Sequence, residues 1–201
     1  MPMDPLEVAA SYDRIADRWA SPRFDRSNGI RPHERALVWA TRTGAALDVG
    51  CGSSGRLIDL LSARGFRVEG VDLSAEMLRL ARVRHPQVPF FHADICSWSL
   101  PRPYDFISGW DSIWHVPLAR QRDVLLKLFA GLTRGGLIIF SAGGREAPDE
   151  RRDHGMGVPM YHATIGVPRI VAAIHDGGCT LRHFEYDQYP EEHVYFIAQR
   201  D

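Results

Sequence analysis

The sequence predicts a single α/β domain: a mostly parallel, seven-stranded sheet with helices on both faces and a C-terminal antiparallel hairpin. Two observations carry this prediction. Short apolar runs alternate with helical patterns between residues 45 and 141, as is typical of strand–helix–strand units. The last two apolar runs, 181–186 and 193–198, have only the hexapeptide DQYPEE between them, so they are expected to pair antiparallel. The length of 201 residues fits one domain.

Residues 1–43 are expected to form an N-terminal helical cap. Residues 5–20 place apolar side chains at helical spacing and predict a first helix. Proline and glycine follow and end it. Pro32 then marks the start of a second helix, which is expected to run to about residue 41.

Residues 44–141 are expected to form the core of the sheet. Gly65 ends the first helix of this segment. Ser74 caps the next one, which carries Glu76 in its first turn. The expected elements are strand 45–49, helix 56–64, strand 66–71, helix 75–84, strand 88–92, strand 104–108, helix 119–132 and strand 137–141.

The C-terminal third has two parts. Residues 142–165 are polar and glycine-rich, and form too long a connection for an ordinary loop. They are expected to be a lid-like loop on the rim of the sheet. Residues 166–201 are expected to contain a helix over 167–175 and the terminal hairpin, whose turn is DQYPEE.

Composition excludes several classes of protein. The formal net charge of −1 and the absence of a long basic run argue against nucleic-acid binding. No apolar run approaches the length of about 20 residues that spans a bilayer, and the N-terminus lacks a secretory pattern. Three scattered cysteines indicate a reduced, cytoplasmic protein without disulfides. No histidine spacing predicts a metal site. We expect a monomer or homodimer.

The glycine loop LDVGCGSSGRL, residues 47–57, has two interpretations. Counted from Gly50, it has the GxGxxG spacing of a dinucleotide-binding loop. Counted from Asp48, it has an acid two residues before the first glycine, a different signature. Asp72, at the end of the next strand, could accept both ribose hydroxyls of an adenosine under either interpretation. The alternative is a tight strand-to-helix turn without a ligand.

Three features separate these interpretations. Asp48 is costly to bury unless it is paired; a ligand with an α-ammonium would suit it, directly or through water, and a pyrophosphate would be repelled. Asp94, in the stretch HADI, could accept a hydrogen bond from an adenine amino group while Ile95 packs on the ring. The chain carries a terminal hairpin where dehydrogenases usually continue into a second nucleotide-binding half. Alternatively, Asp48 bonds the loop amides and Asp94 caps a turn.

Five stretches follow the order and spacing of one family: LDVGCGSSGRL, VEGVDLSAEML, FHADI, YDFISGWDSIWHV and LTRGGLIIF. Together they resemble the class I S-adenosylmethionine-dependent methyltransferases over roughly residues 45–141. The early SYDRIADRW is similar to a helix that precedes the core in many small-molecule members. The resemblance implies the Rossmann-like fold of that class, S-adenosylmethionine as cofactor and S-adenosylhomocysteine as product.

The resemblance also implies roles around the cofactor. Asp48 matches the acid of the first motif, Asp72 would take the ribose hydroxyls, and the residues beside the methionine part would be Gly50, Cys51 and Gly52. The adenine would lie among Leu73, Met77, Asp94 and Ile95. Gly109 and Trp110 would lie beside the reactive methyl group, and Tyr12 would close over the ligand. The chain departs from the pattern at Ser54, where many members have a third glycine; here Gly55 comes one residue later.

The acceptor is expected to bind beyond the carboxyl ends of the strands, where GWDSIWHVP, residues 109–117, lies. His115 is the candidate general base because its ordinary pKa lies near neutrality. Asp111 is a candidate substrate contact or base, although either side chain could instead cap or pack. Trp110 and Trp114 could stack on a flat acceptor or belong to the core.

At the end of the lid-like loop, the stretch GVPMYHAT is apolar and aromatic. Tyr161 and His162 are therefore expected to face the substrate, unless they pack the loop down.

These observations predict methyl transfer from S-adenosylmethionine to a small-molecule acceptor, which the two tryptophans suggest is planar or aromatic. Two alternatives remain: an NAD-dependent oxidoreductase, or a non-catalytic S-adenosylmethionine-binding module. An enclosed cavity at the rim near Trp110 and His115 would favour the enzyme, and a filled or flat rim would favour the binding module.

Overall fold

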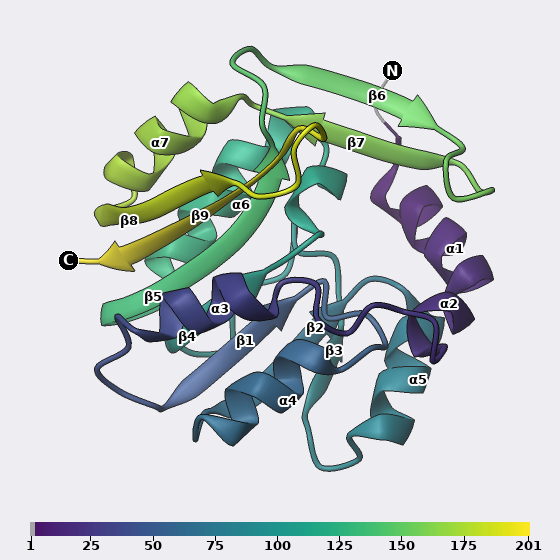
Figure 1. Ribbon diagram of the computed structural model, residues 1–201, viewed down its shortest axis with the longest axis horizontal. Helices are drawn as coiled ribbons and strands as arrows, with labels where there is room; N and C mark the ends of the chain where they lie inside the picture. The colour runs from purple at the N-terminus through teal and green to yellow at the C-terminus, as the bar shows by residue number, and fades with distance from the viewer. Residues whose placement is uncertain (1–2) are drawn as a thin grey trace.

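A computed structural model describes residues 3–201, and its centre is a seven-stranded sheet. The strand order is β3-β2-β1-β4-β5-β9-β8. β1 to β5 run parallel, and β9 is antiparallel to both β5 and β8 (Figure 1). The strands are β1 Ala45–Val49, β2 Arg67–Asp72, β3 Phe90–His92, β4 Tyr104–Gly109, β5 Leu132–Gly143, β8 Cys179–Tyr186 and β9 His193–Arg200. The predicted fold class is confirmed.

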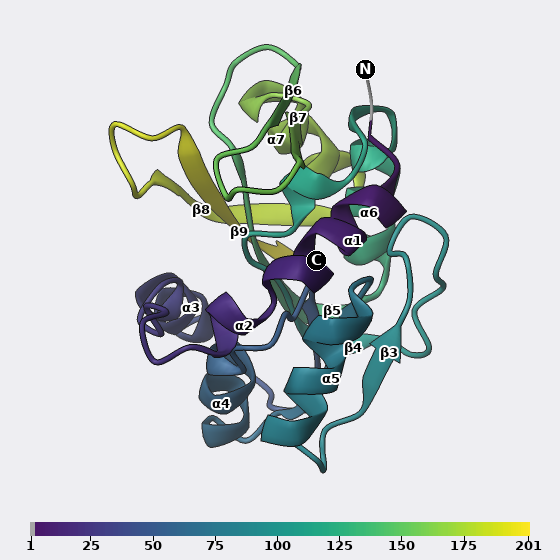
Figure 2. The ribbon, with the colours of Figure 1, turned by 90° about the vertical axis from the view of Figure 1, so that its right-hand side faces the viewer.

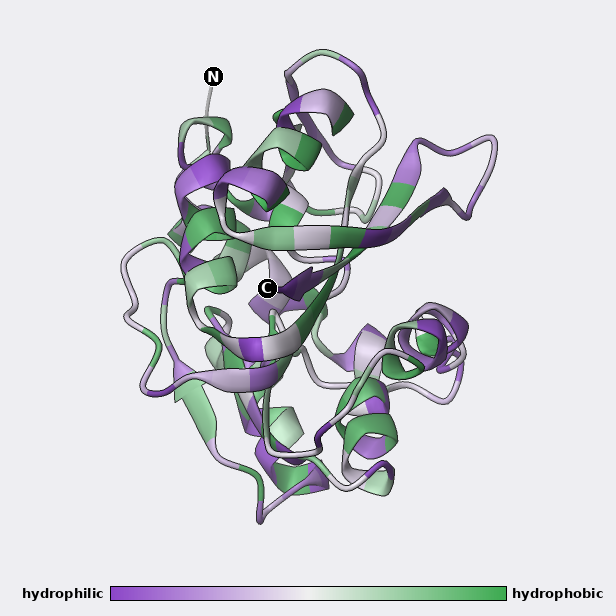
Figure 3. Ribbon diagram, turned by 90° about the vertical axis from the view of Figure 1, so that its left-hand side faces the viewer, coloured by the Kyte–Doolittle hydropathy of each residue, from purple (hydrophilic) through white to green (hydrophobic). Residues whose placement is uncertain are grey.

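Two groups of helices cover the sheet. α6 and α7 pack on one face, and α3 and α4 on the other, as the side view shows (Figure 2). These helices carry both hydrophobic and hydrophilic residues (Figure 3), as expected of helices with one buried face. The helices are α1 Pro5–Ile15, α2 Asp17–Ala20, α3 Ile30–Leu37, α4 Arg56–Ala63, α5 Ala75–Arg84, the short 3₁₀ helix η1 Ile113–His115, α6 Leu118–Ala130 and α7 Val167–Asp176.

The expected lid-like loop contains a second small sheet. β6 Asp149–Asp153 and β7 Met160–Thr164 pair antiparallel across the top of the molecule (Figure 1). Val158 and Met160 pack against Val8 and Ile15 of α1 in a hydrophobic cluster of their own. We call α1 and the β6–β7 hairpin together the roof.

Several predicted boundaries are wrong. The first helix breaks at Ala16, where α1 gives way to α2. The second begins at Ile30, because Gly29 caps it in the left-handed conformation and Pro32 is tolerated within the first turn; it ends at Leu37. The helix predicted over 119–132 is α6, which ends at Ala130.

Strand β5 starts earlier than predicted, at Leu132, which pairs with Tyr104. The register of β4 and β5 shifts between Tyr104 and Phe106, so the Gly135-Gly136 pair lies within the strand at an irregularity of the ladder. Strand β3 starts later, at Phe90, and the two C-terminal strands extend over 179–186 and 193–200.

Candidate active site

One large cavity of about 870 Å³ opens at the carboxyl ends of the parallel strands, beneath the roof. It has two ends with different linings. The loop end is formed by the glycine loop and by the residues that follow β2 and β3, including Gly50, Asp72 and Asp94. The ring end is lined by aromatic and imidazole rings: Trp114, His115, His162 and His193.

Gly50 makes the tight turn at the loop end possible. Its φ of +69° lies in the left-handed region, and a Cβ on it would come within 2.3 Å of Ser112 Cβ. Its amide donates to the Val71 carbonyl at 2.8 Å. Ser112 Oγ donates to the Val49 carbonyl at 2.8 Å. The turn therefore joins β1 to β2 and to the segment after β4.

Asp72 presents its carboxylate to the cavity from the end of β2. Its Oδ2 accepts from the Gly52 amide and its Oδ1 from the Ser74 amide, both at 2.9 Å. Burial raises the pKa of Asp72, and these backbone hydrogen bonds act against the rise. Leu73 and Met77 line the same part of the cavity.

Asp94 and Ile95 also line the loop end. Asp94 Oδ1 accepts from the Cys96 amide at 2.8 Å, so the side chain caps a turn and borders the cavity at once. Cys51 and Gly52 also line the cavity.

Asp48 lies behind the glycine loop and outside the cavity lining. It is only 3% exposed. Burial raises its pKa to about 7, opposed by the charge of Arg56 and a hydrogen bond with Ser108. The Ser108 hydroxyl is also 3.0 Å from His33 Nε2. β1 turns the Asp48 side chain into the polar network below the loop, so the side chain does not line the cavity, and its contact with the ligand through water stays a prediction.

Trp110 is a core residue at the edge of the cavity. It is 3% exposed, its Nε1 donates to Asn28 Oδ1 at 3.2 Å, and its ring packs against Tyr195 and His193. Gly109 is buried below it and does not line the cavity. Trp114 is partly exposed and lines the ring end.

His115 has both ring nitrogens engaged. Nδ1 is 2.7 Å from the Tyr161 carbonyl oxygen, which can only accept, so Nδ1 carries the proton. Nε2 is 2.7 Å from the Tyr12 hydroxyl and 3.1 Å from Trp114 Nε1. Burial lowers the pKa of His115 to about 4. The neutral ring thus accepts from Tyr12 and Trp114, and its lone pair is occupied.

Asp111 lines the cavity and is held by partners from several elements. It has a φ of +54°, and its amide donates to Ser141 Oγ at 2.8 Å. Oδ2 accepts from Asn28 at 2.9 Å, with Arg56 at 3.9 Å, and Oδ1 lies 3.2 Å from His193 Nε2. Burial acts to raise its pKa, but His193, Asn28 and Arg56 hold it below the ordinary value.

Sequence reasoning missed His193. Its Nε2 faces Asp111 and its Nδ1 bonds Asp187, so the ring lies between two carboxylates. Burial lowers its pKa, but the hydrogen bonds and charges of Asp111 and Asp187 raise it by more, above the ordinary value. The order and direction of the strands would have indicated it. An antiparallel last strand begins at the edge where the parallel strands end, and His193 pairs with Gly143 at the end of β5.

Alternation along β7 separates the two predicted substrate contacts. His162 lines the cavity, whereas Tyr161 does not. Tyr161 is fully buried, and its hydroxyl donates to Glu150 Oε2 at 2.7 Å and accepts from the Leu118 amide at 3.0 Å. The prediction that its side chain faces the substrate is wrong, because adjacent residues of a strand point to opposite faces. Its carbonyl still positions His115.

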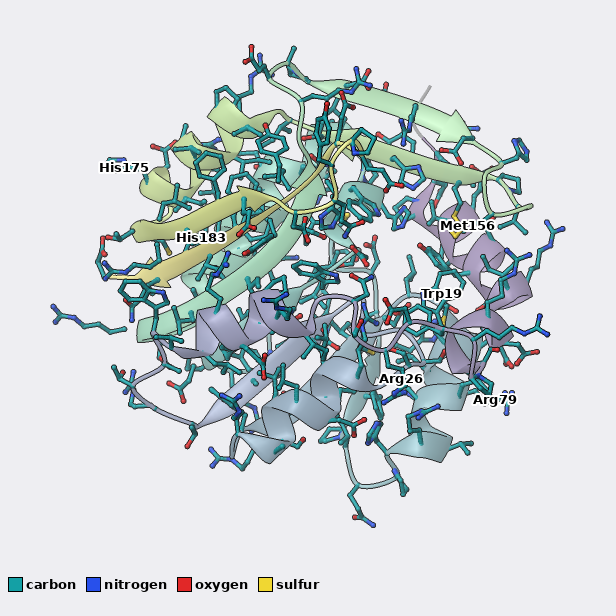
Figure 4. The ribbon with its side chains drawn as sticks, viewed as in Figure 1. Trp19, Arg26, Arg79, Met156, His175 and His183 are labelled. Atoms are coloured by element: carbon teal, nitrogen blue, oxygen red, sulfur yellow. The ribbon has the colours of Figure 1, made fainter. Side chains whose placement is uncertain are left out.

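The N-terminal segment contributes more to the site than predicted. Tyr12 lines the cavity as expected, and so do Trp19, Phe24 and Asn28. Figure 4 shows Trp19 and Met156 on the same side of the molecule, and both line the cavity. Arg18 Nη1 donates to the Met156 carbonyl at 2.8 Å, which ties α2 to the tip of the β6–β7 hairpin.

Residues 3–201 contain neither a metal-type cluster nor a helix fit to cross a membrane. No group of three or more His, Cys, Asp or Glu side chains there is arranged to hold a metal ion. Every helix in this part of the chain falls short of the length and apolar character needed to cross a bilayer.

The fold and the cavity define an α/β protein of the Rossmann-like class with its site at the carboxyl ends of the strands. A family profile described as a methyltransferase domain matches residues 46–136. Trans-aconitate 2-methyltransferase of Paracidovorax citrulli is 34% identical over 137 residues, which are 65% of this chain and 49% of that protein. This chain therefore spans about half the length of that curated relative.

Solved structures of methyltransferases share the fold of this chain. Magnesium protoporphyrin IX methyltransferase from Synechocystis, with bound S-adenosylmethionine, has a TM-score of 0.74 at 17% identity, covering 99% of this chain and 98% of that one. The Burkholderia thailandensis 1,6-didemethyltoxoflavin-N1-methyltransferase has a TM-score of 0.73 at 17% identity, covering 100% and 92%. Over its core the chain therefore resembles the class I S-adenosylmethionine-dependent methyltransferases in sequence, and it shares their fold.

Proposed function

We propose that this protein transfers a methyl group from S-adenosylmethionine to a small-molecule acceptor. One observation carries the proposal: a single cavity joins a loop end suited to a nucleoside to a ring end with room for a second molecule. A binding module that had lost its acceptor pocket would instead have a filled or flat rim.

The loop end fits the cofactor. Asp72 offers the cavity a carboxylate whose position is fixed by two backbone amides, and a carboxylate is a good acceptor for paired ribose hydroxyls. Gly50 brings the backbone to the cavity without a Cβ. When bound, S-adenosylmethionine supplies an electrophilic methyl group on a positively charged sulfur.

The residues of this chain would bind and orient the cofactor and the acceptor, and would shield the reaction from water. The roof covers the cavity and would exclude water from the reaction, which strengthens electrostatic interactions inside. His115 and Asp111, the two candidate catalytic side chains, have their acceptor atoms occupied by protein partners. We therefore assign them positioning roles: His115 fixes Tyr12 and β7, and Asp111 fixes His193.

The ring end favours a planar acceptor. Trp114 lies with its ring centroid 5.4 Å from that of His193 and 6.2 Å from that of His162, and all three line the cavity. Flat π-surfaces stack on flat ligands. The acceptors in the names of the relatives differ, so they do not choose one for this chain.

Calorimetric titration with S-adenosylhomocysteine, with NAD in a parallel run, tests the cofactor. Binding of S-adenosylhomocysteine alone supports the proposal, and binding of NAD alone or of neither contradicts it. Radiolabelled S-adenosylmethionine and a panel of phenols, thiophenols and anilines then test methyl transfer. Wild-type protein that binds the cofactor product but labels no acceptor would favour the non-catalytic module.

A further inference from the structure

The ring end contains one imidazole whose two nitrogens face different surroundings. Nδ1 of His162 is buried and lies 3.2 Å from Asp153 Oδ2. Nε2 makes no hydrogen bond to any of residues 3–201. Since the Nδ1 edge is turned to Asp153, the edge that carries Nε2 is left to face the cavity that His162 lines.

We propose that His162, oriented by Asp153, is the general base that takes the proton from a hydroxyl acceptor. This inference rests on the proposed function and narrows it to acceptors that must lose a proton. The other cavity histidines are engaged: His115 accepts from Tyr12, and His193 lies between two carboxylates.

The small hairpin builds the pair. His162 on β7 is directly opposite Arg151 on β6. Asp153 is two residues further along β6, and therefore on the same face. A carboxylate beside Nδ1 favours the tautomer with its proton on Nδ1 and its lone pair on Nε2. The contact of Nδ1 with Asp153 is bent away from good hydrogen-bond geometry, and catalytic hydrogen bonds commonly tighten only when ligands bind.

The charges around the ring suit a base. Burial lowers the pKa of His162, the charge of Asp153 raises it, and that of Arg151 lowers it again; the net pKa lies below the ordinary value. From η1, the neighbouring group is neutral His115, with a ring centroid 5.0 Å away. His162 is therefore neutral and able to accept a proton near neutral pH.

The step balances. A lone pair of the acceptor oxygen forms the new bond to the methyl carbon, and the carbon–sulfur bond breaks with its electron pair going to sulfur. The hydroxyl proton moves to His162 Nε2. Asp153 stabilises the resulting imidazolium, which later releases the proton to water.

Imidazole ¹⁵N NMR of the labelled protein with S-adenosylhomocysteine tests the geometry, with His162→Gln as the assignment control. We expect His162 to be neutral with its proton on Nδ1. Asp153→Asn should lower its pKa and shift the proton toward Nε2. Asp149→Asn, the same change at the other end of β6, should leave the tautomer unchanged. A proton on Nε2 in the wild type, or no response to Asp153→Asn, would overturn the inference.

Turnover tests the chemistry with matched phenol and thiophenol acceptors. His162→Gln should lower kcat for the phenol about 100-fold or more and leave the thiophenol, already ionised, within a few-fold. S-adenosylhomocysteine affinity should not change. Equal losses of kcat for both acceptors would mean that His162 has only a structural role. Wild-type protein that methylates thiophenols but no phenol would overturn this inference and leave the proposed function standing. A wild-type protein that binds no S-adenosylhomocysteine would instead defeat the proposed function.

Discussion

At the loop end of the cavity, polar side chains are held by backbone amides no more than 20 residues away, whereas at the ring end they are held by side chains from distant elements. Asp94 bonds the amide two residues later, and Asp72 bonds amides of its own and the adjoining loop. At the ring end, Tyr12 reaches His115 across 103 residues, and Asp111 reaches His193 across 82.

This difference indicates which end of the cavity should tolerate substitutions. The loop end depends on backbone conformation, which only a few residue types can adopt. The ring end depends on contacts between side chains. Substitutions there can therefore change which acceptor binds while the loops keep their conformation. The largest expected effects therefore come from the backbone at the loop end and from the buried charges at the ring end.

The strongest test of the loop end is Gly50→Ala. The left-handed φ and the overlap with Ser112 should together cost about 2–4 kcal/mol of unfolding free energy. Affinity for S-adenosylhomocysteine should fall by at least about tenfold, on the scale of 1.4 kcal/mol per decade. Urea unfolding and calorimetric titration measure the two effects.

The matched control is Gly135→Ala. Gly135 has a φ of +76°, but nothing lies within 4 Å of its added Cβ. This variant isolates the left-handed strain, about 1–2 kcal/mol. An equal loss in both variants would show that the close approach of Gly50 to Ser112 is unimportant.

The corresponding test of the ring end is His193→Gln. It leaves Asp111 and Asp187 without their shared partner and should cost about 2–3 kcal/mol of unfolding free energy at mildly acidic pH. The pKa of His193 is raised in the fold. Its contribution is therefore complete below its ordinary pKa of about 6.5 and is lost as pH rises through the folded value.

Urea unfolding of both proteins from about pH 6 to about pH 9 checks the sign. The gap between wild type and variant should narrow as pH rises. His175→Gln is the control, since His175 is exposed and lies far from the roof (Figure 4). A constant gap would mean that His193 is neutral in the fold.

The same contrast between the two ends distinguishes what could be predicted from the sequence from what could not. Strands β1, β2 and β4 are short, and a glycine or an aspartate marks the carboxyl end of each: Gly50 follows β1, Asp72 ends β2 and Gly109 ends β4. Local patterns therefore predicted both the strands and the loop-end residues. His115, Trp114 and His162 were located at the rim for the same reason. What each would bond to was not predictable, because their partners come from other parts of the chain.

Three differences from what the sequence led us to expect have identifiable physical causes. The segment DERRD of β6 is charged and lacks alternation, so only its pairing with β7 makes it a strand. Asp48 turned away from the cavity because Ser108 and Arg56 are available below the loop. His193 was overlooked because its role depends on strand order, which brings β9 beside β5.

A milder test of the loop end is Asp72→Ala. Loss of a carboxylate that faces the cavity should weaken S-adenosylhomocysteine binding by about 1–3 kcal/mol. Calorimetry measures it, with Asp176→Ala as the control, because Asp176 is an exposed partner of Arg122 outside the cavity lining. Unchanged affinity in Asp72→Ala would remove Asp72 from the cofactor site.

The smallest effect is expected from Tyr12→Phe, which keeps the ring but removes the hydroxyl that donates to His115 Nε2. One lost hydrogen bond should cost about 0.5–1.5 kcal/mol of unfolding free energy. That bond stabilises the neutral imidazole, so its loss should raise the pKa of His115 from about 4, while burial still holds it below 6.5.

Urea unfolding and an NMR titration of His115 check both effects. Because the pKa of His115 is lower in the folded protein than in the unfolded chain, the free energy of unfolding decreases as pH falls from 6.5 toward 4. The variant, with a less depressed pKa, should lose less unfolding free energy over that range. The control is Tyr186→Phe, whose hydroxyl donates to the Gly144 carbonyl at a more exposed site. If Tyr12→Phe leaves the pKa of His115 unchanged, Trp114 alone suffices to occupy Nε2, and the ring end is supported more locally than the long-range contact implies.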